Sequence, residues 1–217
     1  MLDPMQNKVI NRAMNPIRSI CVYCGSSSGR GENYSSAGRM LGRSIAGAGL
    51  RLVYGGGTRG IMGAVAGGAI EAGGKVTGII PRFLLNKEAT QSALGEMDDV
   101  VIVEDMHSRK HRMFEESDAF VALPGGIGTL EEVVEIMTWG QLGRHRKPIA
   151  FVNIDDFWRP MLALLDHMRA EGFVHTGHLV QPLVVDTADA VVPAVMTQAA
   201  MLAESASQGD MRVIDRL

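Results

Sequence analysis

The stretch that decides the fold is AFVALPGGIGTLEEVVEIM, residues 119–137. Its first five residues are apolar, a glycine-rich loop follows, and a helical pattern begins at Leu130. A glycine loop between a strand and a helix leaves backbone N–H groups open to an anion, and the helix start adds a partial positive charge. The stretch therefore predicts a phosphate-binding loop with two carboxylates, Glu131 and Glu132, directly behind it.

Apolar runs alternate with helical patterns along the rest of the chain. Continuous apolar strands are typical of a sheet that is covered on both faces. Strand–helix alternation predicts a Rossmann-like α/β fold, a doubly wound parallel sheet with helices on both faces. The predicted strands are 20–24, 52–54, 76–80, 100–103, 119–123, 149–152 and 183–185, and the predicted helices are 34–48, 61–72, 108–116, 130–142, 157–169 and 188–202.

Length and composition indicate a single domain. The 217 residues are 46% hydrophobic and 21% charged, and a net charge of -3 gives no basic field for nucleic acid. We expect a flexible N-terminal extension over 1–16, one Rossmann-like domain over 17–203, and a polar C-terminal tail over 204–217. No apolar run is long enough to cross a membrane, and the first residues lack an apolar signal core. The expected location is the cytoplasm.

The two cysteines, Cys21 and Cys24, have the C-x-x-C spacing of some metal and redox sites. However, no second pair exists, and residues three apart in a strand point to opposite faces. We expect both to be small core residues of a protein in a reducing compartment. The six histidines are scattered without a ligand spacing, so neither a metal nor a cofactor is expected.

Glycine- and serine-rich loops follow three of the predicted strands, at 25–29, 55–60 and 124–128. Carboxyl ends of parallel strands meet at one edge of a sheet, so the three loops predict one nucleotide-sized site. The spacing at 55–60 resembles a dinucleotide fingerprint, but it follows the second strand and lacks the acidic partner that NAD requires. The ordinary explanation of these glycines is a tight turn of the backbone. The candidates from these loops are Gly25, Ser26, Gly56 and Gly57.

Several cations lie in MHSRKHR, residues 106–112. A solvated helix face is the ordinary interpretation of such a run. The dipole of a helix start opposes cations, however, so we expect Arg109 and Lys110 to face an anion. The planar fork of an arginine suits a phosphate or the edge of a sugar.

Glu132 has two interpretations that the local sequence leaves open. Thr129 and Glu132 form T-x-x-E, the pattern of a capping box, in which Thr129 caps the helix and Glu132 returns a hydrogen bond. Alternatively, a carboxylate beside a phosphate loop faces positive charge, such as an oxocarbenium ion developing on a ribose.

Taken together, the motifs resemble one family. Residues 124–132 resemble the P-G-G-x-G-T-x-x-E signature of the Lonely Guy family, the cytokinin-activating phosphoribohydrolases, which are often mislabelled lysine decarboxylases. Met106 begins MHSRK, which resembles the second motif of that family, and further similarity lies at 20–27, 54–57, 60–63 and 138–143. The resemblance covers about residues 17–185. Ile127 departs from it, since many members carry Phe or Tyr there.

This resemblance implies a homodimer that hydrolyses the N-glycosidic bond of AMP or of N6-prenyladenine nucleotides, giving a free base and ribose 5-phosphate, without a cofactor. Arg109 and Glu132 match the catalytic pair of the family. The alternative is a non-catalytic nucleotide or cofactor carrier of the same fold. The positions that match the substrate contacts of the family are Glu88, Arg109, Lys110, Gly125, Gly126, Ile127, Gly128, Thr129, Leu130, Glu131 and Thr138.

Overall fold

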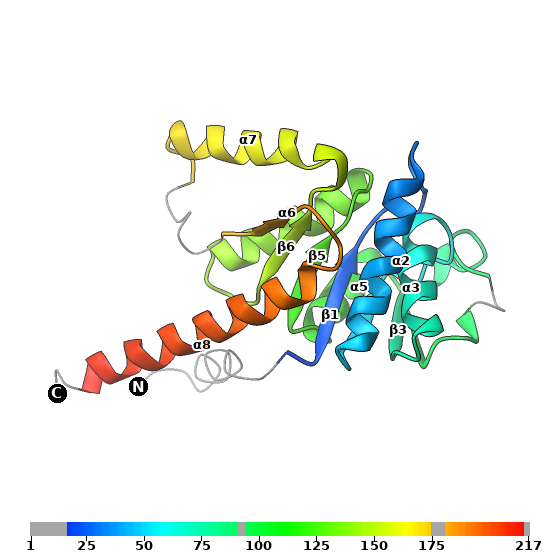
Figure 1. Cartoon of the computed structure of the whole chain (residues 1–217), viewed down its shortest axis with the longest axis horizontal. Coiled ribbons are helices and arrows are strands. Elements are labelled where there is room, and N and C mark those ends of the chain that lie inside the picture. The colour runs from blue at the N-terminus through cyan, green and yellow to red at the C-terminus, as the bar shows by residue number, and fades with distance from the viewer. Residues whose placement is uncertain (1–16, 91–93, 175–180, 215–217) are drawn as a thin grey trace.

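Seven parallel strands form one sheet in the order β4-β3-β2-β1-β5-β6-β7, which confirms the predicted α/β fold (Figure 1). The computed structural model describes residues 17–90, 94–174 and 181–214, with side chains as far as Ser205. The elements are β1 Ser19–Tyr23, α2 Glu32–Gly47, β2 Arg51–Tyr54, α3 Gly60–Glu71, β3 Val76–Pro81, η2 Arg82–Leu84, β4 Asp99–Val103, α5 Met106–Glu115, β5 Ala119–Ala122, α6 Ile127–Gln141, β6 Ile149–Val152, η3 Ile154–Asp156, α7 Arg159–Ala170, β7 Leu183–Val185 and α8 Val191–Ile214.

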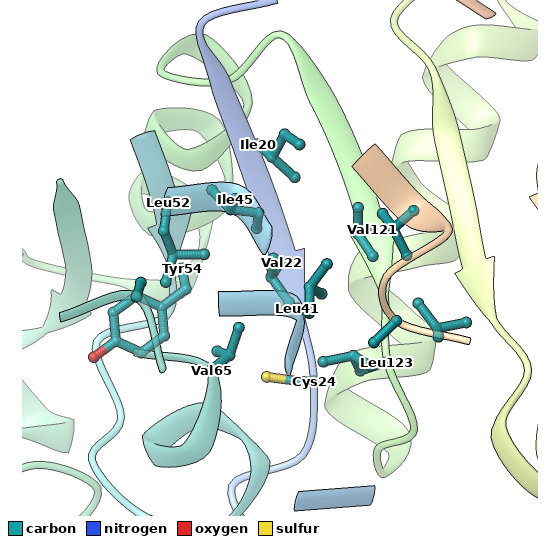
Figure 2. Close-up of a cluster of buried hydrophobic side chains, with 14 of the residues drawn as sticks. Ile20, Val22, Cys24, Leu41, Ile45, Leu52, Tyr54, Val65, Val121 and Leu123 are labelled. Atoms are coloured by element: carbon teal, nitrogen blue, oxygen red, sulfur yellow. The ribbon is translucent and has the colours of Figure 1, made fainter. Parts of the chain in front are cut away.

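The sheet separates two hydrophobic cores. On one face, side chains of α2, α3 and α8 pack on the central strands, and Figure 2 shows Leu41 of α2 and Val65 of α3 beside Val22 of β1. On the other face, α5, α6 and α7 cover a core that contains Phe120 and Phe151. Every residue of β1 is buried, as expected for a strand enclosed on both faces.

The two cysteines lie in different cores, as their spacing predicts. Cys24 belongs to the α2–α3–α8 side, and Cys21 to the α5–α6–α7 side. Both are buried free thiols, and burial raises the pKa of each far above its usual range. The prediction of small core residues is confirmed.

Helices α2 and α3 approach each other backbone to backbone because glycines face the contact. A Cβ built on Gly42 would lie 2.1 Å from the carbonyl oxygen of Val65, and one on Gly68 would lie 2.1 Å from that of Arg39. Such distances exclude any side chain at either glycine. The amphipathic pattern of α2, with Leu41 and Ile45 buried, turns the same helix toward the sheet.

The chain changes direction across the sheet between β1 and β5. Strand β1 pairs with β2 on one side and with β5 on the other, and Cys21 is opposite Val53 and Phe120. The helices that follow β1 and β5 cover opposite faces, so the loops after these two strands diverge. Ligands of open α/β sheets bind at such a switch point.

The predicted helix ranges differ from the structure by three residues or more at two helices, α6 and α8. Helix α6 begins at Ile127 rather than Leu130, so the last glycine of the loop, Gly128, is helical. Helix α8 continues past the predicted end at 202 to Ile214, and Figure 1 shows its red end lying apart from the sheet. The predicted extension at 1–16 lies outside the described residues.

Candidate active site

The three predicted rim loops are in direct contact at the switch point. The N–H of Gly25 donates to the carbonyl oxygen of Pro124 at 3.1 Å, and the N–H of Met62 donates to that of Gly25 at 3.1 Å. Gly60 has φ +58, and a Cβ there would lie 2.5 Å from the backbone of Ser26. The structure therefore brings the loops after β1, β2 and β5 together.

The first turn of α6 is open to solvent at the tip of this junction. Its N-cap residue, Gly126, offers no side chain to the first N–H groups, and residues 126–128 are exposed. Beneath the tip, a Cβ on Gly125 would lie 2.1 Å from Oγ1 of Thr129, so only glycine fits. Uncapped N–H groups at a helix start are the groups that hold a phosphate in other proteins.

Of the two interpretations of Glu132, the structure does not support the capping box at Thr129 and Glu132. Because glycines allow the helix to begin at Ile127, Thr129 occupies the third helical position instead of the N-cap. Both side chains turn inward, and Thr129 is 4% exposed and Glu132 5% exposed. Glu132 is thus held by burial in the core-facing side of α6.

Glu132 is a buried carboxyl with an unusual proton affinity. Burial raises its pKa from 4.5 to about 7, although the positive charges of Arg109 and Lys110 act in the opposite direction. The negative charges of Glu131 and Glu88 contribute to the increase. A carboxyl with a pKa near 7 populates both protonation states at neutral pH, which suits a general acid or base.

Arg109 lies on the buried face of α5 and is 4% exposed. Its Nη2 donates to the carbonyl oxygen of Gly55 at 3.0 Å, and Nη1 lies 3.7 Å from Sδ of Met106. Its Nε is buried without a hydrogen-bond partner among the described residues. A Cβ on Gly55 would lie 1.8 Å from Nη2, so the absence of a side chain at Gly55 makes room for the guanidinium.

Glu88 comes from the segment after η2 and has an unpaired oxygen. Its Oε2 is buried and has no hydrogen-bond partner in the described part of the chain. Its charge and that of Arg109 both act on Glu132, so the three charged groups share one site. In the sequence, only the resemblance to the family pointed to Glu88.

Lys110 is engaged by protein carboxylates. Its ammonium forms an ion pair with Glu131 and a second, at 3.2 Å, with Glu135, and its side chain is 13% exposed. Partial burial lowers the pKa of Lys110, but these ion pairs outweigh it and raise the pKa overall. The pairs fasten α5 to α6 beside the site.

Thr138 lies away from this group. It is exposed on α6, and its hydroxyl donates to the carbonyl oxygen of Val134 at 2.8 Å. Eleven residues separate it from Ile127, which is about 16 Å along a helix. Of the predicted set, the structure gathers the others around the loop and leaves Thr138 on the outer face of α6.

Sequence reasoning missed several residues that shape the site. Gly55 receives Arg109, and Thr58 bonds to the segment that carries Glu88. Asp105 caps α5, since its carboxylate accepts the N–H of Ser108 at 2.7 Å. Only the cap had a signal in the sequence, an aspartate three residues before Ser108. Among the predicted loop glycines, Gly56 adopts φ +73, and a Cβ on Gly57 would meet Sδ of Met62.

Together, the fold and the site define a Rossmann-like α/β protein of the nucleotide-binding class. An open helix start lies at the switch point of the sheet, and a buried arginine and two buried or partly buried carboxylates lie beside it. In the described residues, no group of three or more His, Cys, Asp or Glu side chains is arranged to hold a metal ion.

Comparison with known proteins identifies the family. The family model described as "possible lysine decarboxylase" matches residues 62–195. A cytokinin riboside 5'-monophosphate phosphoribohydrolase of Arabidopsis thaliana is 48% identical over 157 residues, which is 72% of this chain and 68% of that protein. Its counterpart from Rhodococcoides fascians is 43% identical over 175 residues, covering 80% and 87%. The chain belongs to this family, the Lonely Guy (LOG) family.

Solved structures of lower identity share the fold. The molybdenum cofactor binding protein of Rippkaea orientalis is 19% identical with a TM-score of 0.61, and 84% of this chain and 96% of that chain are covered. The molybdenum cofactor carrier protein of Chlamydomonas reinhardtii is 21% identical with a TM-score of 0.61, covering 85% and 99%. At such identities, the likeness concerns the arrangement of helices and strands alone.

Proposed function

We propose that this protein hydrolyses the N-glycosidic bond of nucleoside 5'-monophosphates, either AMP or N6-prenyladenine nucleotides. The bond between C1' of the ribose and N9 of the base breaks, water supplies the hydroxyl at C1' and a proton to the base, and the products are a free base and ribose 5-phosphate. The carrying observation is the buried Glu132, with a pKa near 7, beside the buried Arg109 and the open start of α6. Curated relatives named for this reaction support the proposal.

The 5'-phosphate binds at residues 125–129, where uncapped N–H groups and the helix dipole favour an anion. Binding energy at the phosphate, remote from the bond that breaks, holds the ribose over the buried charges. Glu132, as a carboxylate, stabilises positive charge at C1' and orients water. Arg109 presents its unpaired Nε–H to the sugar or to the departing base. Glu88 offers its unpaired Oε2 to a ligand hydroxyl or N–H.

The test is incubation of the purified protein with AMP and with the N6-isopentenyl form, followed by separation of free base from nucleotide. We expect release of base and ribose 5-phosphate, and loss of about 100-fold or more in kcat for Glu132→Ala. If Glu132→Ala is folded and releases adenine at the parent rate, the assignment of Glu132 is wrong. The ratio of the two turnover rates gives the base preference.

The alternative is a carrier that binds a nucleotide or cofactor without reacting. It is less supported, because the solved carriers share only the fold, whereas the relatives above 40% identity are named phosphoribohydrolases. A buried carboxyl beside an anion site also has little use in a pure binder. Tight binding of AMP with no base released would favour the carrier.

We also propose that the protein is a homodimer joined through the outer face of α6. Ile127, Val134 and Leu142 are exposed there by 81%, 45% and 71%, and they lie on one stripe at helical spacing. Thr138 lies on the same stripe, so a substrate contact by Thr138 requires the site of a second copy. Light scattering should give twice the chain mass, and Leu142→Glu should shift it toward the monomer. A monomeric parent at micromolar concentration would refute the dimer.

Within the described residues, no helix combines the length and hydropathy needed to cross a membrane. The two buried free thiols suit a reducing compartment, and on that basis we propose the cytoplasm. Cell fractionation tests this.

A further inference from the structure

The short turn between β2 and α3, residues 55–58, contacts the Arg109 guanidinium at one end and the main chain of Glu88 at the other. At its start, the carbonyl oxygen of Gly55 accepts Nη2 of Arg109 at 3.0 Å. At its end, the N–H of Thr58 donates to the carbonyl oxygen of Glu88 at 2.8 Å. One turn thus contacts both the guanidinium and the segment that carries the unpaired carboxylate.

The side chain of Thr58 strengthens the second contact. Its Oγ1 lies 3.4 Å from the carbonyl oxygen of Glu88 and accepts the N–H of Thr90 at 3.2 Å. A hydroxyl donates one hydrogen bond and accepts others, so both bonds form at once. The main chain is therefore fixed at Glu88 itself and again two residues later.

The bonds of the N–H groups at 87 and 88 are local. The N–H groups of Lys87 and Glu88 both donate to the carbonyl oxygen of Leu84 at 3.0 Å, and Asn86 adopts φ 68 within the tight turn that results. These bonds shape the turn, and the contacts with Thr58 tie it to the loop that follows β2. The burial of Ala89, at 3% exposed, holds the following residue against the core.

Glu88, which this segment carries, is partly buried, and its Oε2 is buried with no hydrogen-bond partner among the described residues. An acceptor in that state costs free energy unless a ligand supplies a donor. It contributes to a ligand site only if its main chain is held in place, because the carboxylate would otherwise rotate or move out to water. Thr58 supplies that restraint from the turn that also contacts Arg109.

We propose that Thr58 is a positioning residue of this site, and that the turn at 55–58 fixes the Glu88 carboxylate relative to the Arg109 guanidinium. Thr58 acts through Glu88 and makes no contact with the substrate. This inference rests on the proposed function, because it treats Glu88 as a group that binds the nucleotide.

The experiment compares Thr58→Val, Thr58→Ser, Glu88→Gln and the double variant Thr58→Val/Glu88→Gln, with AMP as substrate. Valine keeps the shape but removes the hydroxyl, whereas serine retains it. We expect Thr58→Val to lose about tenfold in kcat/KM, mainly through KM, because the loss corresponds to hydrogen bonds to a binding group. Thr58→Ser should stay within about threefold of the parent. When Glu88→Gln is already present, adding Thr58→Val should lower kcat/KM by less than about twofold.

A structural role would give another pattern. If Thr58→Val costs the same factor with and without Glu88, Thr58 does not act through Glu88 and the proposal is overturned. The proposal also fails if Thr58→Val leaves kcat/KM unchanged while Glu88→Gln lowers it.

A readout independent of turnover separates this proposal from the proposed function. Amide hydrogen exchange at Thr90 should accelerate about tenfold or more in Thr58→Val and stay near the parent rate in Thr58→Ser. If the parent releases no base from AMP, the proposed function fails, and exchange at Thr90 then decides whether Thr58 holds the segment. Unchanged exchange in Thr58→Val would overturn the restraint itself.

Discussion

Replacing Glu132 by glutamine should stabilise the protein while it abolishes turnover. The folded state raises the pKa of Glu132 from 4.5 to about 7, mainly because the side chain is buried. A raised pKa means that the folded state binds the proton more tightly than the unfolded chain does. Ionisation of Glu132 therefore lowers the free energy of unfolding, progressively between pH 4.5 and 7 and fully above that range.

The magnitude follows from the size of the shift. At about 1.4 kcal/mol per pKa unit, a change from 4.5 to about 7 corresponds to about 3 kcal/mol above pH 8. Glutamine has nearly the shape of the protonated carboxyl and does not ionise, so it escapes this cost. We expect Glu132→Gln to exceed the parent by about 3 kcal/mol at pH 8 and to match it below pH 4.5.

The assay is urea unfolding of both proteins at pH 4.5, 6 and 8, with base release measured on the same preparations. Glu131→Gln is the matched control, because the Glu131 side chain is 52% exposed and its ion pair is worth about 1 kcal/mol or less. A difference between Glu132→Gln and the parent that stays constant from pH 4.5 to 8 would refute the reasoning. So would a variant that gains stability and still turns over AMP at the parent rate.

Three further predictions concern other features. Gly55→Ala should displace the Arg109 guanidinium, which lies 1.8 Å from the added Cβ position, and lower kcat at least about tenfold with little loss of fold content by circular dichroism. Gly42→Ala should lower the free energy of unfolding in urea by about 2 kcal/mol or more, because the added Cβ would lie 2.1 Å from a carbonyl oxygen. Gly47→Ala is the control and should not be destabilised, because a Cβ there has no atom within 4 Å. Burial lowers the pKa of His145 from 6.5, so its contribution to stability is present above pH 6.5 and is lost as pH falls. In the Glu132→Gln variant, the free energy of unfolding should therefore fall as pH falls below 6.5. Adding His145→Gln should reduce this pH dependence. An unchanged dependence on pH would contradict the assignment to His145.

The sequence was sufficient for the strands because each is a short, continuous apolar run bounded by glycine or a polar turn. The family resemblance also paired Arg109 with Glu132, and the structure places both side chains in one buried site. The sequence pattern misjudged the start of α6, which it placed at Leu130 and which lies at Ile127. Glycines at 126 and 128 accept helical or extended backbone equally well, so the local pattern did not decide where the helix begins.

Other properties of the site depend on contacts between segments far apart in the chain. The raised pKa of Glu132 comes from burial under residues of several elements, which no local pattern encodes. Gly55 and Arg109 meet across 54 positions, and Thr58 meets the carbonyl of Glu88 across 30. For Thr138, the motif suggested a site residue, but the residue lies on the exposed face of α6, away from the loop of the same chain.

The glycine contact between α2 and α3 has a consequence for how a ligand enters. At Gly42 and Gly68 the two backbones are in direct contact, without flexible side chains between them. We therefore expect the two helices to move as one rigid unit. The segments that lead into them, 25–31 and 55–59, are consequently the stationary wall of the site. We therefore expect a ligand to enter and leave beside residues 126–128, which are exposed at the start of α6.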